Sequence, residues 1–318
     1  MAKKYKFLTD EQVESFMRDG YIKLEGAFSK EKAEAWKQDA WIRLDMDPND
    51  MSTWNREWIN MPVIRSEKIE DFSPVAWGAM LELIGGIERL RMDRDSWGDN
   101  FIVNLGTPET HNAEPPHPRD LDAWHCDGDS YKHFLDSPEV ALLMIPLFSK
   151  VESKGGCTFI SPDATTKIIE FLRDHPEGVG GGDGAPWKPT PGEMVKASHQ
   201  FIECTGEPGD VFLCHPLMMH TKSQNNTRVP RFMINPWAAL NEPHKFKRDN
   251  TDDYSLVELK TLKELGRTPE EGYDFRATTE RKAAPSKRHG IQAEWKRQEL
   301  ERLARAGIVP RVISTLVS

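Results

Sequence analysis

The chain has 318 residues, of which 38% are hydrophobic and 29% charged, the balance of an ordinary soluble globular protein. Its formal net charge of −9 argues against a nucleic acid or an anionic membrane as partner. The longest apolar run, residues 140–148, is far below the roughly 18 residues that a membrane span needs. The N-terminus has no apolar stretch of the kind found in secretory signals, and the four cysteines form no CxxC pair. We therefore expect a cytoplasmic protein with reduced, mostly buried thiols.

Three helices and one strand are expected in the first ninety residues. Each helix follows a side chain that can cap its free N–H groups. These caps are Thr9, Ser29 and Ser73. Gly20 is expected to end the first helix, and residues 21–24 then alternate like a short strand. The second helix is predicted as one element, because its apolar residues recur at helical spacing over 33–44, and Gly85-Gly86 ends the third.

From about residue 100 to residue 240 the pattern changes to short β-type runs broken by Pro, Gly and Asn. The predicted strands are residues 101–105, 123–127, 140–148, 157–160, 201–204, 211–215, 218–221 and 231–235. Many short strands with such punctuation indicate a mainly β fold, a sandwich, jelly roll or barrel. One helix is expected at 165–174, and the glycine-rich residues 177–184 are interpreted as a flexible loop, because no GK[ST] phosphate-binding sequence follows them.

Residues beyond about 245 are highly charged. Surface helices are predicted at 256–265 and 294–306, with an extended or disordered segment at 276–289 between them. We expect a single domain over 1–318, with a helical part at about 1–95, a β core at about 96–242 and a charged helical extension at about 243–318.

Two segments carry the residues that indicate chemistry. In Trp124-His125-Cys126-Asp127, the histidine and aspartate are two apart, so on a strand they project from the same face. The second segment, 209–231, is a Gly-Asp turn, an apolar strand leading to His220, and a polar turn before Arg231. If this segment folds as a hairpin, Arg231 lies beside His220.

Two histidines and one carboxylate are the facial triad with which non-haem Fe(II) oxygenases bind their metal, leaving three positions open. A 2-oxo acid fills two open positions through its carboxylate and keto oxygen, and O₂ takes the third. Arginine suits the far carboxylate of such an acid, because its planar fork donates two parallel hydrogen bonds. The pattern therefore favours His125, Asp127 and His220 as metal ligands, with Arg231 binding an acidic co-substrate.

Five segments together resemble the phytanoyl-CoA dioxygenase family of Fe(II)/2-oxoglutarate oxygenases. They are LTDEQVESFMRDGYIKLEGAFS, FIVNLGT, WHCD, GGCTFISPDAT and GDVFLCHPLMMHTKSQNNTRVPR, which span roughly residues 8–237. The resemblance implies a double-stranded β-helix (jelly-roll, cupin-like) core with flanking helices. It also implies Fe(II) at His125, Asp127 and His220, 2-oxoglutarate at Arg231, and a contact between 2-oxoglutarate and Asn104. The chain departs from the family at Lys222, where serine is frequent.

Other candidates are weighed against this assignment. His215 is the alternative to His220 and Arg228 the alternative to Arg231. The family spacing of eleven residues between distal histidine and arginine favours His220 with Arg231. His215 is then interpreted as structural, and Trp124 as either a pocket residue or a packing residue. Surface positions are predicted for His111, His117 and His133, and a role outside the metal's direct ligands for Asp129.

The carboxylate at Asp127 favours hydroxylation, desaturation or cyclisation over halogenation, because related halogenases replace it with a small residue. Two other interpretations stay open, a metal-dependent hydrolase or isomerase on a cupin-like barrel and a non-catalytic binding protein of the same fold. The absence of a basic cluster for CoA phosphates slightly favours a small metabolite as substrate. The sequence leaves the oligomeric state undetermined.

Overall fold

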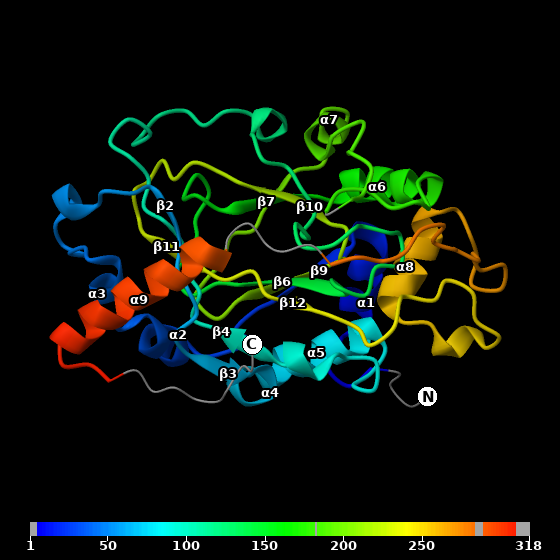
Figure 1. Cartoon of the computed structure of the whole chain (residues 1–318), viewed down its shortest axis with the longest axis horizontal. Helices are drawn as coiled ribbons and strands as arrows, with labels where there is room; N and C mark the ends of the chain where they lie inside the picture. The colour runs from blue at the N-terminus through cyan, green and yellow to red at the C-terminus, as the bar shows by residue number, and fades with distance from the viewer. Residues whose placement is uncertain (1–4, 182, 284–288, 310–318) are drawn as a thin grey trace.

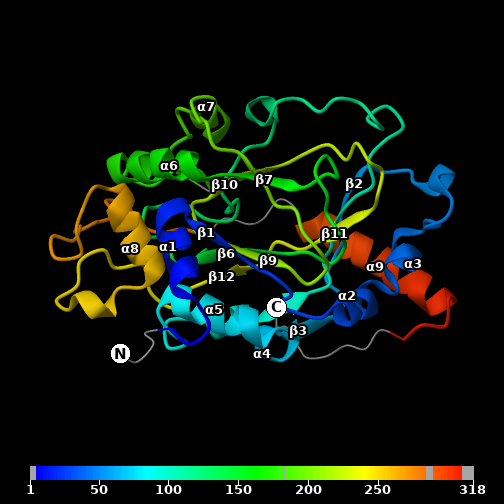
Figure 2. The same cartoon turned by 180° about the vertical axis from the view of Figure 1, so that it is seen from behind.

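The computed structural model describes residues 5–181, 183–283 and 289–309 of the chain, and here sheets and helices form layers (Figures 1 and 2). A four-stranded antiparallel sheet lies across the middle. Its strands, in order across the sheet, are β1 (Tyr21–Leu24), β9 (Val211–Cys214), β6 (Leu142–Pro146) and β12 (Trp237–Ala238). A second antiparallel sheet faces it, with the order β10 (Met219–Lys222), β7 (Thr158–Ser161) and β8 (Ile202–Glu203).

Two smaller sheets complete the β structure of the described residues. The first has the order β11 (Arg231–Met233), β5 (Ile102–Asn104) and β2 (Trp58–Asn60), and the second pairs β3 (Ser66–Lys68) with β4 (Ser96–Gly98). A single bridge between Leu147 and Met233 joins the chain after β6 to β11. The smaller three-stranded sheet therefore continues from one end of the central sheet.

The central strands bury side chains on both faces. Leu143, Ile145, Phe212 and Cys214 belong to a cluster with Ile160 of the facing sheet. The intervening residues Leu142, Met144, Val211 and Leu213 belong to a larger cluster that includes the buried side chains of the covering helices. Because side chains alternate along a strand, β6 and β9 require apolar residues at every position.

The helices lie around these sheets. They are α1 (Asp10–Asp19), α2 (Lys30–Lys37), α3 (Ala40–Leu44), α4 (Ile69–Phe72), α5 (Pro74–Ile84), α6 (Pro162–Asp174), α7 (Pro191–Val195), α8 (Leu256–Glu264) and α9 (His289–Arg305). In both views α4 and α5 lie on one side of the central sheet, whereas α6 and α7 lie beyond the facing sheet (Figures 1 and 2). None of the helices in the described part of the chain is long and apolar enough to cross a membrane.

Local sequence signals are confirmed where they depend on a cap. Thr9 and Gln12 form the capping box of α1, and Gly20 ends the helix in a left-handed conformation with φ 75°. Ser73 caps α5, which Gly85 ends at φ 93°. The single helix predicted over 33–44 is wrong, because α2 ends at its C-cap Gln38 and a separate helix, α3, begins at Ala40.

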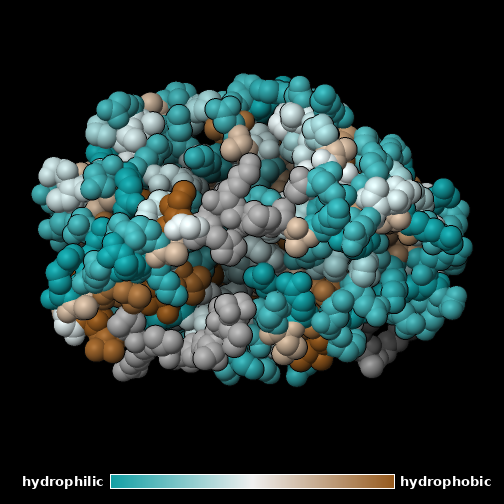
Figure 3. Space-filling model, in the orientation of Figure 1, coloured by the Kyte–Doolittle hydropathy of each residue, from teal (hydrophilic) through white to brown (hydrophobic). Residues whose placement is uncertain are grey.

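The prediction that α8 is a surface helix is also wrong. A capping box of Ser255 and Glu258 begins this helix, and most of its residues are buried. Glu258 is 1% exposed because it binds Arg89 and Arg248. The charge of Glu258 is therefore compensated in buried ion pairs and does not mark a surface helix. By contrast, the face drawn in Figure 3 is mainly hydrophilic. The four cysteines are free and buried, as predicted.

Candidate metal centre and its cavity

His125 and His220 come together through their backbones. His125 N–H donates to the carbonyl of His220 (3.1 Å), and His220 N–H donates back to His125 (2.9 Å). This antiparallel bridge sets the two imidazole rings side by side, with centroids 4.3 Å apart. Asp127 Oδ1 lies 3.6 Å from Nε2 of each ring. One ligand atom from each of the three residues falls within 4.8 Å of the others.

The predicted strand over 123–127 is wrong, although its side chains do meet. Only His125 pairs with β10, because the backbone turns on either side of it, with φ 63° at Ala123 and φ 130° at Gly128. Glycine adopts the second of these conformations without a steric penalty. The geometry that places Asp127 beside both rings is therefore a turn after one bridge, and not the alternation of a strand.

Hydrogen bonds fix which ring nitrogen faces the centre. His125 Nδ1 lies 2.7 Å from the carbonyl of Ala123, and His220 Nδ1 lies 3.0 Å from that of Met218. Because a carbonyl only accepts, each Nδ1 carries the proton and each Nε2 keeps a free lone pair. His220 Nε2 and Asp127 Oδ2 are buried and have no hydrogen-bond partner. Such orphaned atoms in this donor set fit a bound divalent cation.

The charges agree with that fit. Burial by itself raises the pKa of Asp127, but the facing His220 and His125 more than offset it and hold that pKa below its ordinary value. Burial lowers the pKa of His220, and the neighbouring carboxylate raises it above its ordinary value. Asp127 is therefore ionised at neutral pH, as a metal ligand must be.

Arg231 begins β11 and is 1% exposed. Its guanidinium lies over the Trp58 ring at 4.6 Å, and Nη2 donates to the Ile102 carbonyl at 3.4 Å. Nε and Nη1 are buried without a partner, and the side chain makes no ion pair with the residues that the structure describes. Burial lowers the pKa of Arg231 to about 10. A buried cation without a counter-ion is costly, so this site is prepared for an anion.

The hairpin predicted between His220 and Arg231 is wrong, because β10 and β11 belong to different sheets. The two strands still meet at one ring, since Lys222 Nζ lies 4.9 Å from the Trp58 centroid. Strand register places Arg231 relative to the triad. Trp58, Asn104 and Arg231 form one row across the sheet. Asn60 lies two residues after Trp58, and its partner Ile102 lies two residues before Asn104, so both share the face of that row. Asn60 and Ile102 line the cavity that contains His125 and Asp127.

Asn104 has protein partners for both ends of its amide. Nδ2 donates to the Ser223 carbonyl at 3.0 Å, and Oδ1 accepts from Gly106 N–H at 3.1 Å. The residue therefore holds the end of β10 against β5. One amide hydrogen remains available, and its contact with a co-substrate stays a prediction.

His215 is structural, as predicted. Its Nε2 lies 2.9 Å from Thr261 Oγ1, and its Nδ1 accepts from Leu217 N–H at 3.2 Å. Trp124 packs against Phe201 and donates to the Pro118 carbonyl, so it is a packing residue. Arg228 lies over Trp54 at 5.4 Å.

The predicted surface position of His133 is wrong, whereas His111 and His117 are exposed as predicted. His133 is 3% exposed and packs against Tyr131 and Trp187. Its Nε2 lies 2.5 Å from the Gly128 carbonyl, next to Asp127. Burial lowers the pKa of His133 to about 4. No local pattern marked this residue, because its burial depends on Val179 and Trp187, which lie far from it in the sequence.

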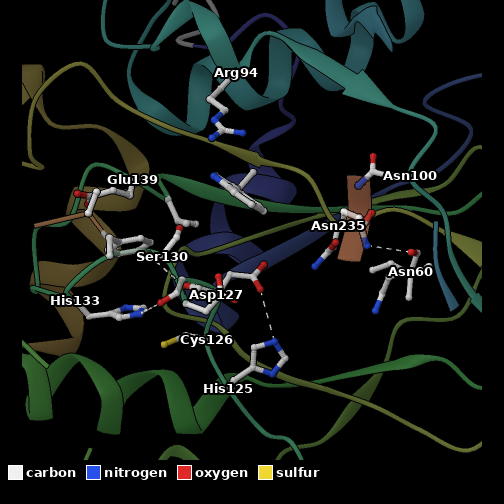
Figure 4. A pocket seen from close by; sticks show the side chains of 18 of the residues that line it. Asn60, Arg94, Asn100, His125, Cys126, Asp127, Ser130, His133, Glu139 and Asn235 are labelled. Carbon is white, nitrogen blue, oxygen red and sulfur yellow. Dashed lines mark hydrogen bonds and ion pairs between the residues drawn. The ribbon is translucent and has the colours of Figure 1, made fainter. Parts of the chain in front are cut away.

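A cavity of about 710 Å³ opens in front of His125 and Asp127 (Figure 4). Its polar lining residues, which sequence reasoning missed, come from separate loops and strands. They include Asn60, Arg91, Arg94, Asn100, Glu139 and Asn235. The extension also contributes, because Ala283 and Gln292 line the cavity and Gln292 Nε2 donates to the Asn60 carbonyl at 3.2 Å.

Comparisons with known proteins give a family and a set of distant structures. The sequence model described as phytanoyl-CoA dioxygenase (PhyH) matches residues 16–233. No curated protein matches the sequence. Among solved structures, the carbocyclase SnoK from nogalamycin biosynthesis is 14% identical, with TM-score 0.43, over 73% of this chain and 84% of that one. EctD from S. alaskensis with 2-oxoglutarate and 5-hydroxyectoine is 16% identical, with TM-score 0.43, over 90% and 88%. HygX from Streptomyces hygroscopicus with nickel and 2-oxoglutarate is 13% identical, with TM-score 0.41, over 74% and 88%.

Proposed function

This chain belongs to the phytanoyl-CoA dioxygenase family, and from that premise we propose that it is an Fe(II)- and 2-oxoglutarate-dependent oxygenase acting on a small-molecule metabolite. The observation that carries the proposal is a set of buried polar atoms without partners beside one cavity. Asp127 Oδ2 and His220 Nε2 lack partners, and so do Nε and Nη1 of Arg231. Together they need a cation and, on the adjoining strand face, an anion.

In this proposal His125, Asp127 and His220 hold the iron, and Arg231 binds the far carboxylate of 2-oxoglutarate. Fe(II), when bound, supplies the reaction of O₂ with 2-oxoglutarate that oxidises the substrate and releases succinate and CO₂. The chain's own part is positioning. The Nδ1 hydrogen bonds of both histidines keep their Nε2 atoms turned inward, and three protein ligands leave room for the co-substrate and O₂.

Arg231 is suited to the co-substrate by its rigidity. Trp58 lies against the face of its guanidinium, and Ile102 accepts a hydrogen bond from one end of it. The unpartnered Nη1 or Nε can then donate to one carboxylate in parallel with the remaining N–H of Nη2. We further propose that the two facing sheets are the halves of a double-stranded β-helix, since their strands are antiparallel and enclose a shared apolar cluster.

An anaerobic titration tests the proposal. Fe(II) with 2-oxoglutarate is expected to give a weak visible charge-transfer band, whereas Zn(II) is expected to give none. His220→Ala should lose the band, and His215→Ala should keep it as the control. A wild-type protein that binds Zn(II) but gives no band would favour a hydrolase or isomerase. A band without succinate release or oxygen consumption would favour a non-catalytic binding protein.

A further inference from the structure

The wall of the cavity facing the metal centre carries an unpaired cation. Arg94 ends the 3₁₀ turn Met92–Arg94 and lines the cavity. Its side chain makes no hydrogen bond or ion pair with the residues that the structure describes, and its Nε atom is buried without a partner. The guanidinium of Arg94 makes a cation–π contact with Trp237, 5.2 Å from the centroid of its ring. Figure 4 shows its guanidinium pointing into the cavity from the side opposite Asp127 and His125.

The neighbouring arginine behaves differently. Arg91 lines the same cavity, but its Nε lies 2.7 Å from Asp93 Oδ1 in an ion pair. A third arginine near this wall, Arg281, pairs with Asp136 at 2.6 Å. Arg94 is therefore the lining arginine whose charge lacks a protein counter-ion among the described residues.

The rest of the lining limits what can bind there. Besides Asp127, the carboxylates Asp129 and Glu139 line the cavity, against the two cations Arg91 and Arg94. Glu139 makes no ion pair with the described residues, and its Oε2 is buried without a partner. Because Arg91 is already paired with Asp93, a ligand with several phosphate charges would meet one free guanidinium beside two carboxylates, whereas one carboxylate is matched by that one guanidinium.

The neutral residues add a second limit. Asn60, Asn100 and Asn235 present amides on the wall to the side of Arg94 (Figure 4). An acyl chain packed here would bury these amides without partners, which is unfavourable. A small polar molecule can satisfy them, and a volume of about 710 Å³ is in the range of small-ligand sites.

We propose that the substrate of this site is a small polar metabolite with a carboxylate that pairs with Arg94, so that its other end is held before the metal. This inference rests on the proposed function and adds the class of substrate to it. Arg94 is a specificity residue in this arrangement, because it touches the substrate and no part of the metal centre.

The test uses three matched sets of compounds with skeletons of four to ten carbons, as carboxylic acids, as their primary amides and as phosphate monoesters. The full-length protein is first saturated with Zn(II) and 2-oxoglutarate, which occupies the metal and Arg231 without turnover. Calorimetric titration then measures binding of each compound. At least one carboxylic acid is expected to bind at least tenfold more tightly than its amide and its phosphate counterpart, because a charge-assisted pair is lost or mismatched in them.

Two variants assign the effect. Arg94→Gln should weaken binding of that acid at least tenfold, whereas Arg91→Gln, the matched loss of a paired arginine in the same wall, should change it less than threefold. Retention of acid binding in Arg94→Gln would overturn the proposal, because the acid would then bind elsewhere. So would equal binding of amides or phosphates, or the absence of any acid that binds at millimolar concentration.

The anaerobic Fe(II) band separates this failure from failure of the proposed function. Arg94→Gln is expected to keep the band with 2-oxoglutarate, since Arg94 is on the far wall. If the wild type gives the band but shows no preference for acids, only the substrate class is wrong. If the wild type gives no band, the oxygenase assignment itself fails.

Discussion

His125, Asp127 and His220 lie inside residues 16–233, the part that matches the family, whereas α8 and α9 follow it. The metal centre is assembled by backbone hydrogen bonds, since His125 and His220 pair through their own N–H and carbonyl groups. Within the extension, helix α9 is attached to the core through side chains, with Arg43 between Asp99 and Glu299 at 2.8 Å each and Gln292 on the cavity wall. The core thus places the triad through its backbone, and the appended helix adds Gln292 to the cavity wall.

The largest effect is expected in the core. Asp127→Ala removes the one negatively charged member of the triad, so iron binding and 2-oxoglutarate turnover should fall to background. Iron content after desalting and succinate release measure the two losses. Asp129→Ala is the matched control, because this carboxylate is exposed on the same loop, and it should retain iron. Iron retained by Asp127→Ala would mean that the triad is misassigned.

The next effect is expected where the extension joins the core. Arg43 is 1% exposed and also donates to the Pro62 carbonyl at 2.7 Å. Arg43→Met leaves the carboxylate of Glu299 buried without its ion pair, whereas Asp99 keeps Arg65 at 3.2 Å, and the change should reduce the free energy of unfolding in urea by about 3–5 kcal/mol.

The control for this change is Arg297→Met on the exposed side of α9, where ion pairs with Glu294 and Glu301 lie in solvent. It should cost less than about 1 kcal/mol. If Arg43→Met costs no more than the control, the attachment of α9 does not depend on this buried pair. Limited proteolysis of the Arg43→Met variant should cut near α9 first, while the anaerobic Fe(II) band persists.

A third effect belongs to the co-substrate. Arg231→Ala removes two charge-assisted hydrogen bonds to a carboxylate, so the KM for 2-oxoglutarate should rise about 100-fold, with iron binding intact. Arg228→Ala, from the turn just before it, should change that KM less than threefold. An unchanged KM in Arg231→Ala would remove its assigned role, and a lost metal would show that it acts on the triad.

The parts of this molecule that the sequence predicted are those fixed by neighbouring residues. The caps at Thr9 and Ser73 act within three residues, so their helices could be predicted. The triad could be proposed from the residue types of His125, Asp127 and His220, although the strand expected over 123–127 is replaced by a turn after one bridge. The assignment of His220 over His215 needed the family spacing as well.

The parts that were missed depend on contacts between distant segments. Strand β2 has three residues and β12 two, so their pairing is set by β5 and β6 and not by their own pattern. Arg94 and Glu139 lie on segments that are far apart in the sequence, and what they share is that both line the cavity. Burial of α8 was missed because its Glu258 pairs with Arg89 and Arg248 from outside the helix, which the periodicity of the sequence does not report.

The smallest effect concerns stability at low pH. It tests whether a buried histidine of the extension, His244, reduces the free energy of unfolding as the pH falls. His244 is 6% exposed, and neither nitrogen of its ring has a hydrogen-bond partner. Its backbone N–H donates to the Asp136 carbonyl at 3.0 Å. Burial lowers the pKa of His244 to about 4; Glu258 raises it, and Arg89 and Arg248 lower it. Because the unfolded chain binds this proton near pH 6.5, the unfolded state gains protons first as pH falls.

The stability that His244 contributes is therefore complete above about pH 6.5 and is lost as pH falls toward 4. Between pH 7 and pH 5 the loss should be about 2 kcal/mol. His244→Gln should flatten this part of the urea-denaturation profile, whereas His111→Gln, at an exposed position, should leave it unchanged. The slope that remains is expected from two histidines of the core, His133, whose pKa is also about 4, and His215, whose pKa burial also lowers well below its ordinary value. If His244→Gln leaves the acid slope intact, the core alone sets the acid limit, because burial of His244 then contributes nothing to it.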